Sequence, residues 1–549
     1  MKIRIEKKFI ILLILLLSIV GTNLIVKEIN LAKLPPDTIT FWLDGYYHLG
    51  LSEIILNTQR IPIRDPFWIS EGVPHVYADG YAIILTTLQL LSGIDGPTAS
   101  NLMMLIFSTL TLITVFLISQ KIFNNEKIAF LISIMLIFVT GFWEYTSLPI
   151  PQTVAIFLMN LIFYFIIKND ILDKKNILIL GLMAGGLCLI HPMSFEVFFL
   201  ITLFFSILTL IFERKKGIKK FLPNLAILAL SFLFSILWWL RLYKAGLNEL
   251  SVREMDEFQM LKHYLWYLSI MVYLAPLGFL IGILKKNKYV LLLLCWILVS
   301  WILIENHRLD YMIYQHYIPE KLEFIKEFLK PNWGQRFFIY ISIPVTILTG
   351  FILNGMYNLN IKIKKINIGR TICLPFVIFG ITLTLLTDTF ITPPWFARLV
   401  YDTWVSESEL EAIQKLENAN IMPSDSMINA DFPFDEVYFG ITGKTSTISP
   451  QLRSSIPLNQ YLNDYIGIYF SNNFDEIKSL ADKYGITHIV LSNRIIEKGH
   501  FATTSSKWNY QLYSGLKNAN LNKFSDKTKF KKIFSYKDVK VFCIQPCKR

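Results

Sequence analysis

The sequence predicts an α-helical polytopic membrane protein with about eleven transmembrane helices and a C-terminal α/β soluble domain. The chain is rich in apolar residues, contains many long apolar runs, and changes composition after about residue 390. Hydrophobic residues make up 53% of the 549 positions and charged residues only 17%, whereas an average soluble protein has about 25% charged residues. No single soluble core buries such an apolar surplus, so most of it is expected to face lipid.

The expected membrane spans are apolar runs that can cross about 30 Å of hydrocarbon at about 1.5 Å per residue. They cover residues 9–27, 98–120, 128–143, 152–168, 176–190, 193–212, 221–240, 264–284, 289–304, 337–357 and 371–388. The first run follows a basic start, MKIRIEKK, but no small-residue cleavage site follows it. We therefore expect an uncleaved anchor at the N-terminus.

The connections between these runs alternate in charge. One set is short and basic, with 21 Lys and Arg in 49 positions, and covers residues 1–8, 121–127, 168–176, 213–220, 285–288 and 358–370. The other set has 12 Lys and Arg in 135 positions and covers residues 28–97, 143–151, 241–263 and 304–336. Positive residues stay in the cytoplasm, so the sequence predicts a cytoplasmic N-terminus and an extracytoplasmic C-terminal domain.

Two domains are expected: a transmembrane domain over residues 1–389 and an α/β domain over residues 390–549. The transmembrane domain includes a long outer segment, residues 28–97. Within that segment, residues 81–91 are apolar but too short to span, which indicates an interfacial or re-entrant helix. Residues 304–336 mix charges with aromatics, which is typical of an amphipathic helix on the outer surface.

The tail sequence has clear element boundaries. SESELEAIQKL is typical of a charged helix with serine caps, and DKYGITHIVLS at 482–492 of a helix end, a glycine stop and a buried strand. KVFCI predicts a last strand. Cys543 and Cys547 lie four residues apart without a metal-ligand pattern. They are either free thiols or, if this end is extracytoplasmic, a short-loop disulfide.

The candidate chemistry lies in the first outer segment, FWLDGYYHLGLSE followed by QRIPIRDPF. Asp44 and His48 are spaced to share one face of a helix. Aromatic neighbours at the membrane surface raise the pKa of a carboxyl group, which suits Asp44 to act as a general base. Supporting roles are open to His48, Glu53, Asp65, Asp79 and, in a later turn, His191, although each is also consistent with an ordinary solvated or structural side chain.

This layout resembles the GT-C superfamily of polyprenyl-phosphate-dependent glycosyltransferases. The stretch from Asp44 to Phe67 is similar to the first motif of the archaeal oligosaccharyltransferase catalytic subunit, whose early Asp lies in the active site. The resemblance implies a GT-C-like fold and a catalytic role for Asp44. It also implies that an Arg at the start of a late span holds the carrier phosphate. Arg336 occupies that position, which is also that of an ordinary interfacial anchor. Arg241 and Lys262 border another outer loop and are further candidates for binding the lipid phosphate.

The chain departs from the oligosaccharyltransferases at two motifs. Their second outer loop carries an acidic motif that helps to bind a divalent metal, but the matching loop here, WEYTSLPIP, has only Glu144. Their Trp-Trp-Asp motif has no counterpart after residue 390. The protein mannosyltransferases and aminoarabinose transferases are therefore the better comparison. No cofactor and no metal site are expected, with a divalent metal as the alternative.

The predicted function is an inverting membrane glycosyltransferase. It would move a sugar from a polyprenyl (dolichyl-type) phosphate to a glycan, lipid or protein acceptor on the extracytoplasmic side of the cell membrane. The alternatives are a transporter or lipid flippase, and a non-catalytic membrane assembly protein. The expected partners are the lipid-linked sugar donor, the acceptor and the bilayer. The net charge of +12 follows the positive-inside pattern, so nucleic acid is not an expected partner.

Overall fold

The structure is a computed structural model, and contacts within it divide the chain into two compact units. Unit 1 consists of residues 1–24, 102–240 and 250–392, and unit 2 of residues 25–101, 241–249 and 393–549. The structure describes residues 43–62, 77–146, 148–169, 172–244, 268, 271–309, 337–359, 362–363, 366–367, 371–373, 375–382, 405–419, 421–423, 426–430, 432–444, 458–496, 501–506, 509–513 and 519–547.

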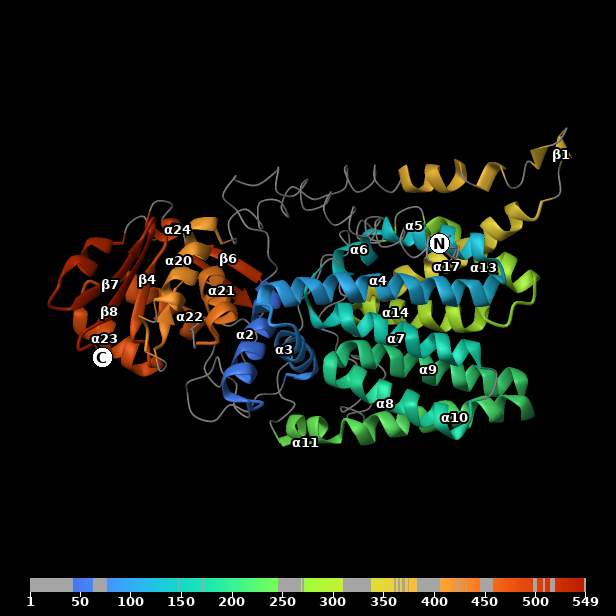
Figure 1. Ribbon diagram of the computed structural model, residues 1–549, viewed down its shortest axis with the longest axis horizontal. Coiled ribbons are helices and arrows are strands. Elements are labelled where there is room, and N and C mark those ends of the chain that lie inside the picture. Colours follow the sequence, from blue (N-terminus) through green and yellow to red (C-terminus); the bar gives the residue numbers. More distant parts are fainter. Residues whose placement is uncertain are drawn as a thin grey trace, which may run out of the picture. The chain divides into compact units, whose positions relative to one another are not determined.

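Unit 1 is a bundle of apolar helices, whose long members run side by side (Figure 1). Its helices are α4 (Gly96–Phe123, which begins in unit 2), α5 (Glu126–Ile137), α6 (Thr140–Thr146), α7 (Pro151–Lys168), α8 (Lys174–Ile190), α9 (Pro192–Glu213), α10 (Lys215–Phe234), α11 (Ile236–Lys244, which ends in unit 2), α13 (Met271–Leu284), α14 (Val290–Leu309) and α17 (Phe338–Tyr357). A further apolar helix runs over Thr371–Thr382, and β1 (Lys362–Ile363) pairs with β2 (Ile366–Asn367).

Five helices in the described part of the chain are long and apolar enough to cross a membrane: α4, α7, α9, α10 and α17. Several predicted spans appear as shorter apolar helices, among them α13 and the first part of α14. Two predicted runs are each broken into two helices. The run 128–143 consists of α5 and α6, and the run 221–240 consists of α10 and α11. The runs at 9–27 and 383–388 and the segment 310–336 lie outside the described residues, so the number of eleven spans stays a prediction.

Helix α17 is the most enclosed of the five long helices, because every residue from Phe338 to Leu353 is buried. Small residues allow the neighbouring helices to approach it closely. Gly278 of α13 lies against the backbone carbonyl of Leu348, and Gly350 of α17 lies against Ile132 of α5. A side chain at either glycine would force the two helices apart.

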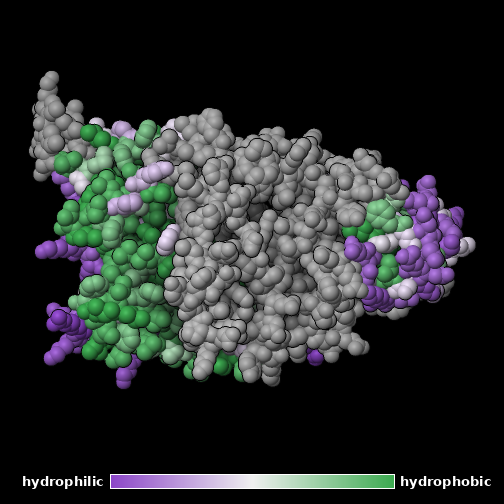
Figure 2. All heavy atoms as spheres, turned by 180° about the vertical axis from the view of Figure 1, so that it is seen from behind, coloured by the Kyte–Doolittle hydropathy of each residue, from purple (hydrophilic) through white to green (hydrophobic). Residues whose placement is uncertain are grey.

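The outside of unit 1 is apolar. Exposed side chains include Phe212 of α9, Leu237 of α11 and Leu284 of α13. Figure 2 shows a broad apolar region in the coloured part of the surface, edged by hydrophilic side chains. A soluble protein seldom exposes so extended an apolar surface. The apolar helices and this surface make the chain a multi-pass membrane protein.

Unit 2 joins the first outer segment to the C-terminal domain. Helices α2 (Leu43–Thr58) and α3 (Gly80–Ser92) pack against each other, and α2 packs against α21 (Phe432–Thr442). Tyr47 and Leu51 of α2, Ala82 of α3 and Phe439 of α21 form one buried cluster. The predicted short helix at 81–91 is thus confirmed as α3.

The C-terminal part of unit 2 contains a four-stranded sheet in the order β3-β4-β8-β7, in which β3 and β4 are parallel and the other neighbours antiparallel. Its strands are β3 (Ile428–Asn429), β4 (His488–Leu491), β7 (Phe530–Tyr536) and β8 (Val539–Ile544). A second sheet pairs β5 (Phe501–Ser506) with β6 (Asn509–Tyr513). The remaining helices are α20 (Glu407–Asn418), α22 (Leu458–Phe470), α23 (Phe474–Tyr484), α24 (Asn493–Ile496) and the 3-10 helix η5 (Leu521–Ser525).

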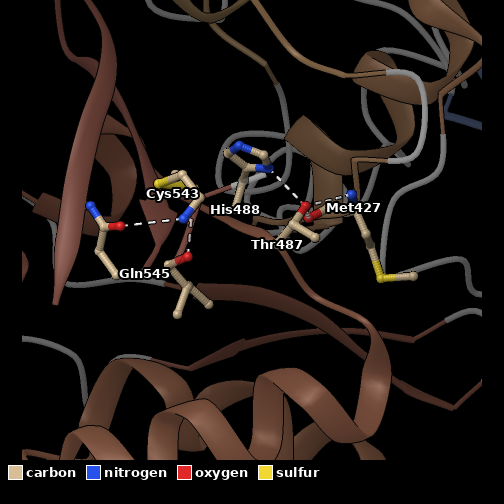
Figure 3. Close-up of a disulfide and its surroundings, with 7 residues drawn as sticks. Met427, Thr487, His488, Cys543 and Gln545 are labelled. Carbon is tan, nitrogen blue, oxygen red and sulfur yellow. Dashed lines mark hydrogen bonds between the residues drawn. A yellow bond between two sulfur atoms is a disulfide. The ribbon is translucent and has the colours of Figure 1, made fainter. Parts of the chain in front are cut away.

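The elements predicted in the tail are confirmed. Ser406 and Glu409 form a capping box at the start of α20, and Gly485 ends α23 in the left-handed conformation before β4 begins. The predicted last strand is β8. Cys543, near the end of β8, forms a disulfide with Cys547 (Figure 3). Of the two possibilities that the sequence left open, free thiols or a short-loop disulfide, the structure has the disulfide. In the same view Thr487 accepts a hydrogen bond from the backbone N–H of Met427, which ties β4 to β3.

Candidate functional site

Helix α2 carries three of the predicted site residues. Asp44 lies in its first turn, and the side chain of Asp44 is outside the described part of the structure. His48 follows one turn later, so the predicted helical relation between the two residues is confirmed at the backbone. Residues 45–52 are buried on every side of the helix rather than on one face. This half of α2 is therefore a core element of unit 2 and not a helix lying on a surface.

His48 lies in an aromatic enclosure. Its ring is 5.2 Å from that of Tyr47, 5.0 Å from that of Tyr77 and 5.3 Å from that of Tyr81, measured between centroids. The histidine is 2% exposed. Burial raises the pKa of Tyr81 and of Tyr46 above the usual tyrosine value, so both phenols stay neutral. Residues 45–52, which follow Asp44 along the helix, therefore lie in an aromatic environment from which water is largely excluded.

Asp79 and Arg241 are brought together from 162 positions apart. The Nη1 of Arg241 lies 2.9 Å from Oδ2 of Asp79, at the N-cap position of α3. Asp79 is nearly buried, whereas 30% of the arginine side chain is exposed. A guanidinium group has five N–H donors in a planar arrangement that matches the oxygens of a carboxylate or a phosphate. The buried carboxylate thus fixes a partly exposed arginine in place.

Glu53 has a structural setting. Gln89 of α3 donates from Nε2 to Oε1 of Glu53 at 2.7 Å, and Ser52 donates to Oε1 of the same glutamine at 2.5 Å. Burial raises the pKa of Glu53, an effect opposed by the Gln89 hydrogen bond and reinforced by the charges of Glu417 and Asp95. These contacts hold α2 against α3, so Glu53 is better explained by packing than by chemistry.

His191 lies in unit 1, where it caps a helix. It is 4% exposed, and its Nδ1 accepts a hydrogen bond from the backbone N–H of Ser194 at 3.2 Å, at the start of α9. The hydroxyl of Ser194 lies 2.6 Å from that of Tyr340 on α17, to which Gln152 of α7 donates at 3.2 Å. These contacts form a network that joins the starts of three helices, α7, α9 and α17.

Sequence reasoning missed two residues near this network. Tyr340 is fully buried and links Ser194 to Gln152. Glu196 lies in α9, two residues after Ser194, and no hydrogen bond to its carboxyl group is found among the described residues. An acid in the otherwise apolar run 193–212 is a signal that could have identified Glu196, because ionisable residues within a membrane are usually functional.

The other candidates lie outside the described residues: Asp65, Lys262 and Arg336 entirely, and Glu144 in its side chain. Their predicted roles therefore stay predictions. Within the described part of the chain, no three His, Cys, Asp or Glu side chains gather as metal ligands would. The structure brings together three groups: His48 with the tyrosines around it in unit 2, the Asp79–Arg241 pair in unit 2, and the His191 network in unit 1.

Comparison with solved structures places this fold among membrane glycosyltransferases. The oligosaccharyltransferase AglB from Archaeoglobus fulgidus, in complex with an inhibitory peptide and a dolichol-phosphate, matches with a TM-score of 0.51 and 10% identity over 92% of this chain and 75% of its own. ArnT from Cupriavidus metallidurans, bound to undecaprenyl phosphate, matches with a TM-score of 0.56 and 9% identity over 97% and 98%. The arabinofuranosyltransferase AftD from Mycobacteria matches with a TM-score of 0.53 and 9% identity over 96% and 40%.

All three are GT-C glycosyltransferases, so the fold that the first outer segment suggested is confirmed. No curated protein matches the sequence in a direct comparison. A family model described as a family of unknown function (DUF6541) matches residues 6–318, which is more than half of the chain. The chain therefore belongs to that family of unknown function, and its fold is that of the GT-C glycosyltransferases.

Proposed function

We propose that this protein is an inverting glycosyltransferase that takes a sugar from a polyprenyl-phosphate carrier and transfers it to an acceptor hydroxyl on the extracytoplasmic side of the membrane. The observation that carries the proposal is the fold shared with ArnT bound to undecaprenyl phosphate, because the match extends over almost the whole of both chains. AglB, which was solved with a dolichol-phosphate, supports the same class of donor.

In the proposed reaction Asp44 acts as the general base. Its carboxylate takes the proton of the acceptor hydroxyl while the hydroxyl oxygen attacks the anomeric carbon of the sugar. The bond between that carbon and the carrier phosphate breaks, and the polyprenyl phosphate leaves with the negative charge. A positioned base contributes about 10²–10⁴ to the rate. The dry aromatic surroundings of α2 support this role, because a poorly solvated carboxylate is a stronger base.

The leaving phosphate needs cationic donors where its charge develops. We assign this task to Arg336, with Arg241 and Lys262 as further donors. The contact between Arg241 and Asp79 supports the assignment of Arg241, because a fixed and partly exposed guanidinium loses little side-chain entropy when it binds a phosphate. Asp79 is then a positioning residue for Arg241 rather than a second base.

We propose that transfer proceeds without a divalent metal, because the second acidic motif of the oligosaccharyltransferases is reduced to Glu144 in this sequence. Dialysis of the purified enzyme against EDTA is expected to leave most of the activity in place. Strict dependence on added Mn²⁺ or Mg²⁺ would show that this chain binds a metal after all. Glu144 and Asp65 would then be the first residues to test as ligands.

The function is tested by mass spectrometry of lipid-linked sugars and surface glycans from cells with and without the gene. Loss of the protein should leave one lipid-linked sugar unconsumed and remove that sugar from one class of acceptor. An active-site variant, Asp44→Asn, should reproduce both changes at normal protein level. Unchanged glycans and lipid-linked sugars in cells that lack the protein would contradict the proposal and favour the transporter or assembly alternatives.

A further inference from the structure

A cavity of about 60 Å³ lies in unit 1, at the ends of α7 and α9 that are opposite to the His191 network. The end of α7, the connection between α9 and α10, and the start of α14 form its wall. Its polar lining includes Thr209, Glu213, Lys219, Lys220, Asn224 and Lys288, together with Asn169 and Tyr289. A space of this size holds about four water-sized groups, which matches a phosphate group with its oxygens. Three of the basic connections, at 168–176, 213–220 and 285–288, contribute to this wall.

The connection between α9 and α10 gives the cavity its shape. A Cβ on Gly217 would lie 2.5 Å from the carbonyl oxygen of Thr209, so only a glycine lets α10 start this close to α9. Asn224 donates from Nδ2 to the hydroxyl of Ser206 at 2.9 Å, and Lys220 lies 2.7 Å from Glu213. These contacts fix the two helices together, so the cavity is part of the folded bundle.

The inner end of the cavity offers a hydrogen-bond donor. Thr209 is 1% exposed, and its hydroxyl has no hydrogen-bond partner among the described residues. Leaving a buried hydroxyl unpaired is unfavourable, because the group has lost its hydrogen bonds to water. An anion in the cavity could accept a hydrogen bond from this hydroxyl and so satisfy it.

The rim of the cavity is basic. Three lysines and one glutamate line it, so their formal charges sum to +2. Lys220 is paired with Glu213, while Lys219 is exposed and forms no ion pair among the described residues. Lys288 is also exposed and lies on the other side, at the start of α14. Lysine side chains therefore lie on two sides of the cavity, and its lining has a net positive charge.

We propose that this cavity binds the phosphate headgroup of an anionic phospholipid from the surrounding leaflet. The apolar residues beside it favour a lipid over a soluble phosphate. Ile211 is 60% exposed, Phe212 70% and Leu222 56%, so these large apolar side chains of α9 and α10 lie on the outside of the bundle. Acyl chains would lie against these side chains while the headgroup fills the cavity. Basic pockets between transmembrane helices commonly hold lipid headgroups in this manner.

The test is native mass spectrometry of the full chain, titrated with phosphatidylglycerol in detergent. Lys219→Gln should weaken binding about fivefold, the effect of about 1 kcal/mol for one lysine near an anionic lipid. Thr209→Val keeps the side-chain size, removes the hydroxyl and should also weaken binding. The matched control is Lys216→Gln, which removes the same charge from an exposed position of α10 that does not line the cavity. It should bind phosphatidylglycerol like the unmodified protein.

Three results would overturn the proposal. Equal weakening by Lys216→Gln and Lys219→Gln would mean that the lipid senses only the overall surface charge. Equal retention of phosphatidylcholine would mean that the cavity does not select an anion. Displacement of the lipid by inorganic phosphate at matched concentration would assign the site to a soluble anion. Thermal unfolding of each variant, which should match that of the unmodified protein, separates lost binding from lost folding.

Discussion

Asp44 stands one helical turn before His48, whose ring is enclosed by three tyrosines. Asp44→Asn keeps the shape of the side chain and removes the base, so transfer should fall at least about a hundredfold. Donor binding should remain, because the carrier phosphate is assigned to Arg336, whereas Arg336→Ala should weaken donor binding. Both variants are measured by the rate of sugar transfer and by binding of the lipid donor to purified protein.

A matched control for Asp44→Asn is Asp538→Asn, the same chemical change at an exposed turn between β7 and β8. It should transfer sugar at the normal rate. Near-normal transfer by a well-folded Asp44→Asn protein would remove Asp44 from the mechanism. Low transfer together with a low amount of folded protein would instead identify Asp44 as a residue needed for folding.

The raised pKa of Glu53 predicts how the stability of unit 2 depends on pH. Burial raises the pKa of its carboxyl group above the unfolded value of 4.5, so the folded state keeps a proton that the unfolded state has released. Its contribution to stability is present below about pH 4.5 and is lost as the pH rises through the folded pKa. Glu53→Gln should therefore flatten the decline of the thermal unfolding midpoint between about pH 4.5 and about pH 7. Parallel curves for the two proteins would contradict this prediction.

At the level of single residues, the sequence indicated candidate site residues but not the residues that they contact. It marked His191 and Arg241 as candidates, but the contact of Arg241 with Asp79 joins positions 162 apart, and no local pattern indicates it. His191 accepts a backbone N–H at the start of α9, a contact that the local sequence did not indicate. Glu196 was overlooked because a single acid changes the mean hydropathy of a 20-residue run very little.

At the level of elements, the tail helix α20, the glycine stop at Gly485 and strand β8 were predictable because capping and strand patterns are local. The packing of α2 against α21 was not predictable, because these helices are separated by almost four hundred residues. A close approach makes this packing possible. A Cβ on Gly440 would lie 2.5–2.9 Å from the side chain and backbone oxygen of Tyr46.

Gly440→Ala should therefore separate α2 from α21 and destabilise unit 2, because small-to-large changes in a packed core cost about 1–3 kcal/mol. Gly467→Ala in α22 is the matched control, since its nearest neighbour is the flexible end of Leu480 at 3.3 Å. The measurement is the thermal unfolding midpoint together with limited proteolysis. Equal midpoints for the two variants would show that α2 and α21 do not depend on this contact.

For the whole molecule, composition and hydropathy were enough to predict a multi-pass membrane protein, and one motif was enough to suggest the GT-C fold. Hydropathy did not reveal that the runs 128–143 and 221–240 each form two helices. The helices end at Phe138 and Ser235 within runs whose average hydropathy stays high, so a hydropathy average does not show the breaks. Orientation depends on the membrane itself, and in the sequence it is the charge pattern that predicts it.

Two single-cysteine variants test this orientation. Lys532→Cys places a thiol on an exposed position of β7, in the domain predicted to be extracytoplasmic. Lys216→Cys places one on the basic connection predicted to be cytoplasmic. The native thiols Cys188, Cys295 and Cys373 are buried, and Cys543 is bonded to Cys547, so the background reaction should be low.

An impermeant thiol reagent added to intact cells should label Lys532→Cys and should reach Lys216→Cys only after lysis. The disulfide supports this expectation, because disulfides persist mainly in oxidising, extracytoplasmic compartments. The opposite labelling pattern would place the C-terminal domain in the cytoplasm. The proposed site on α2 would move with it, since α2 and α21 belong to the same unit. Transfer would then have to use a sugar carrier on the cytoplasmic face, and the proposed direction of the reaction would be wrong.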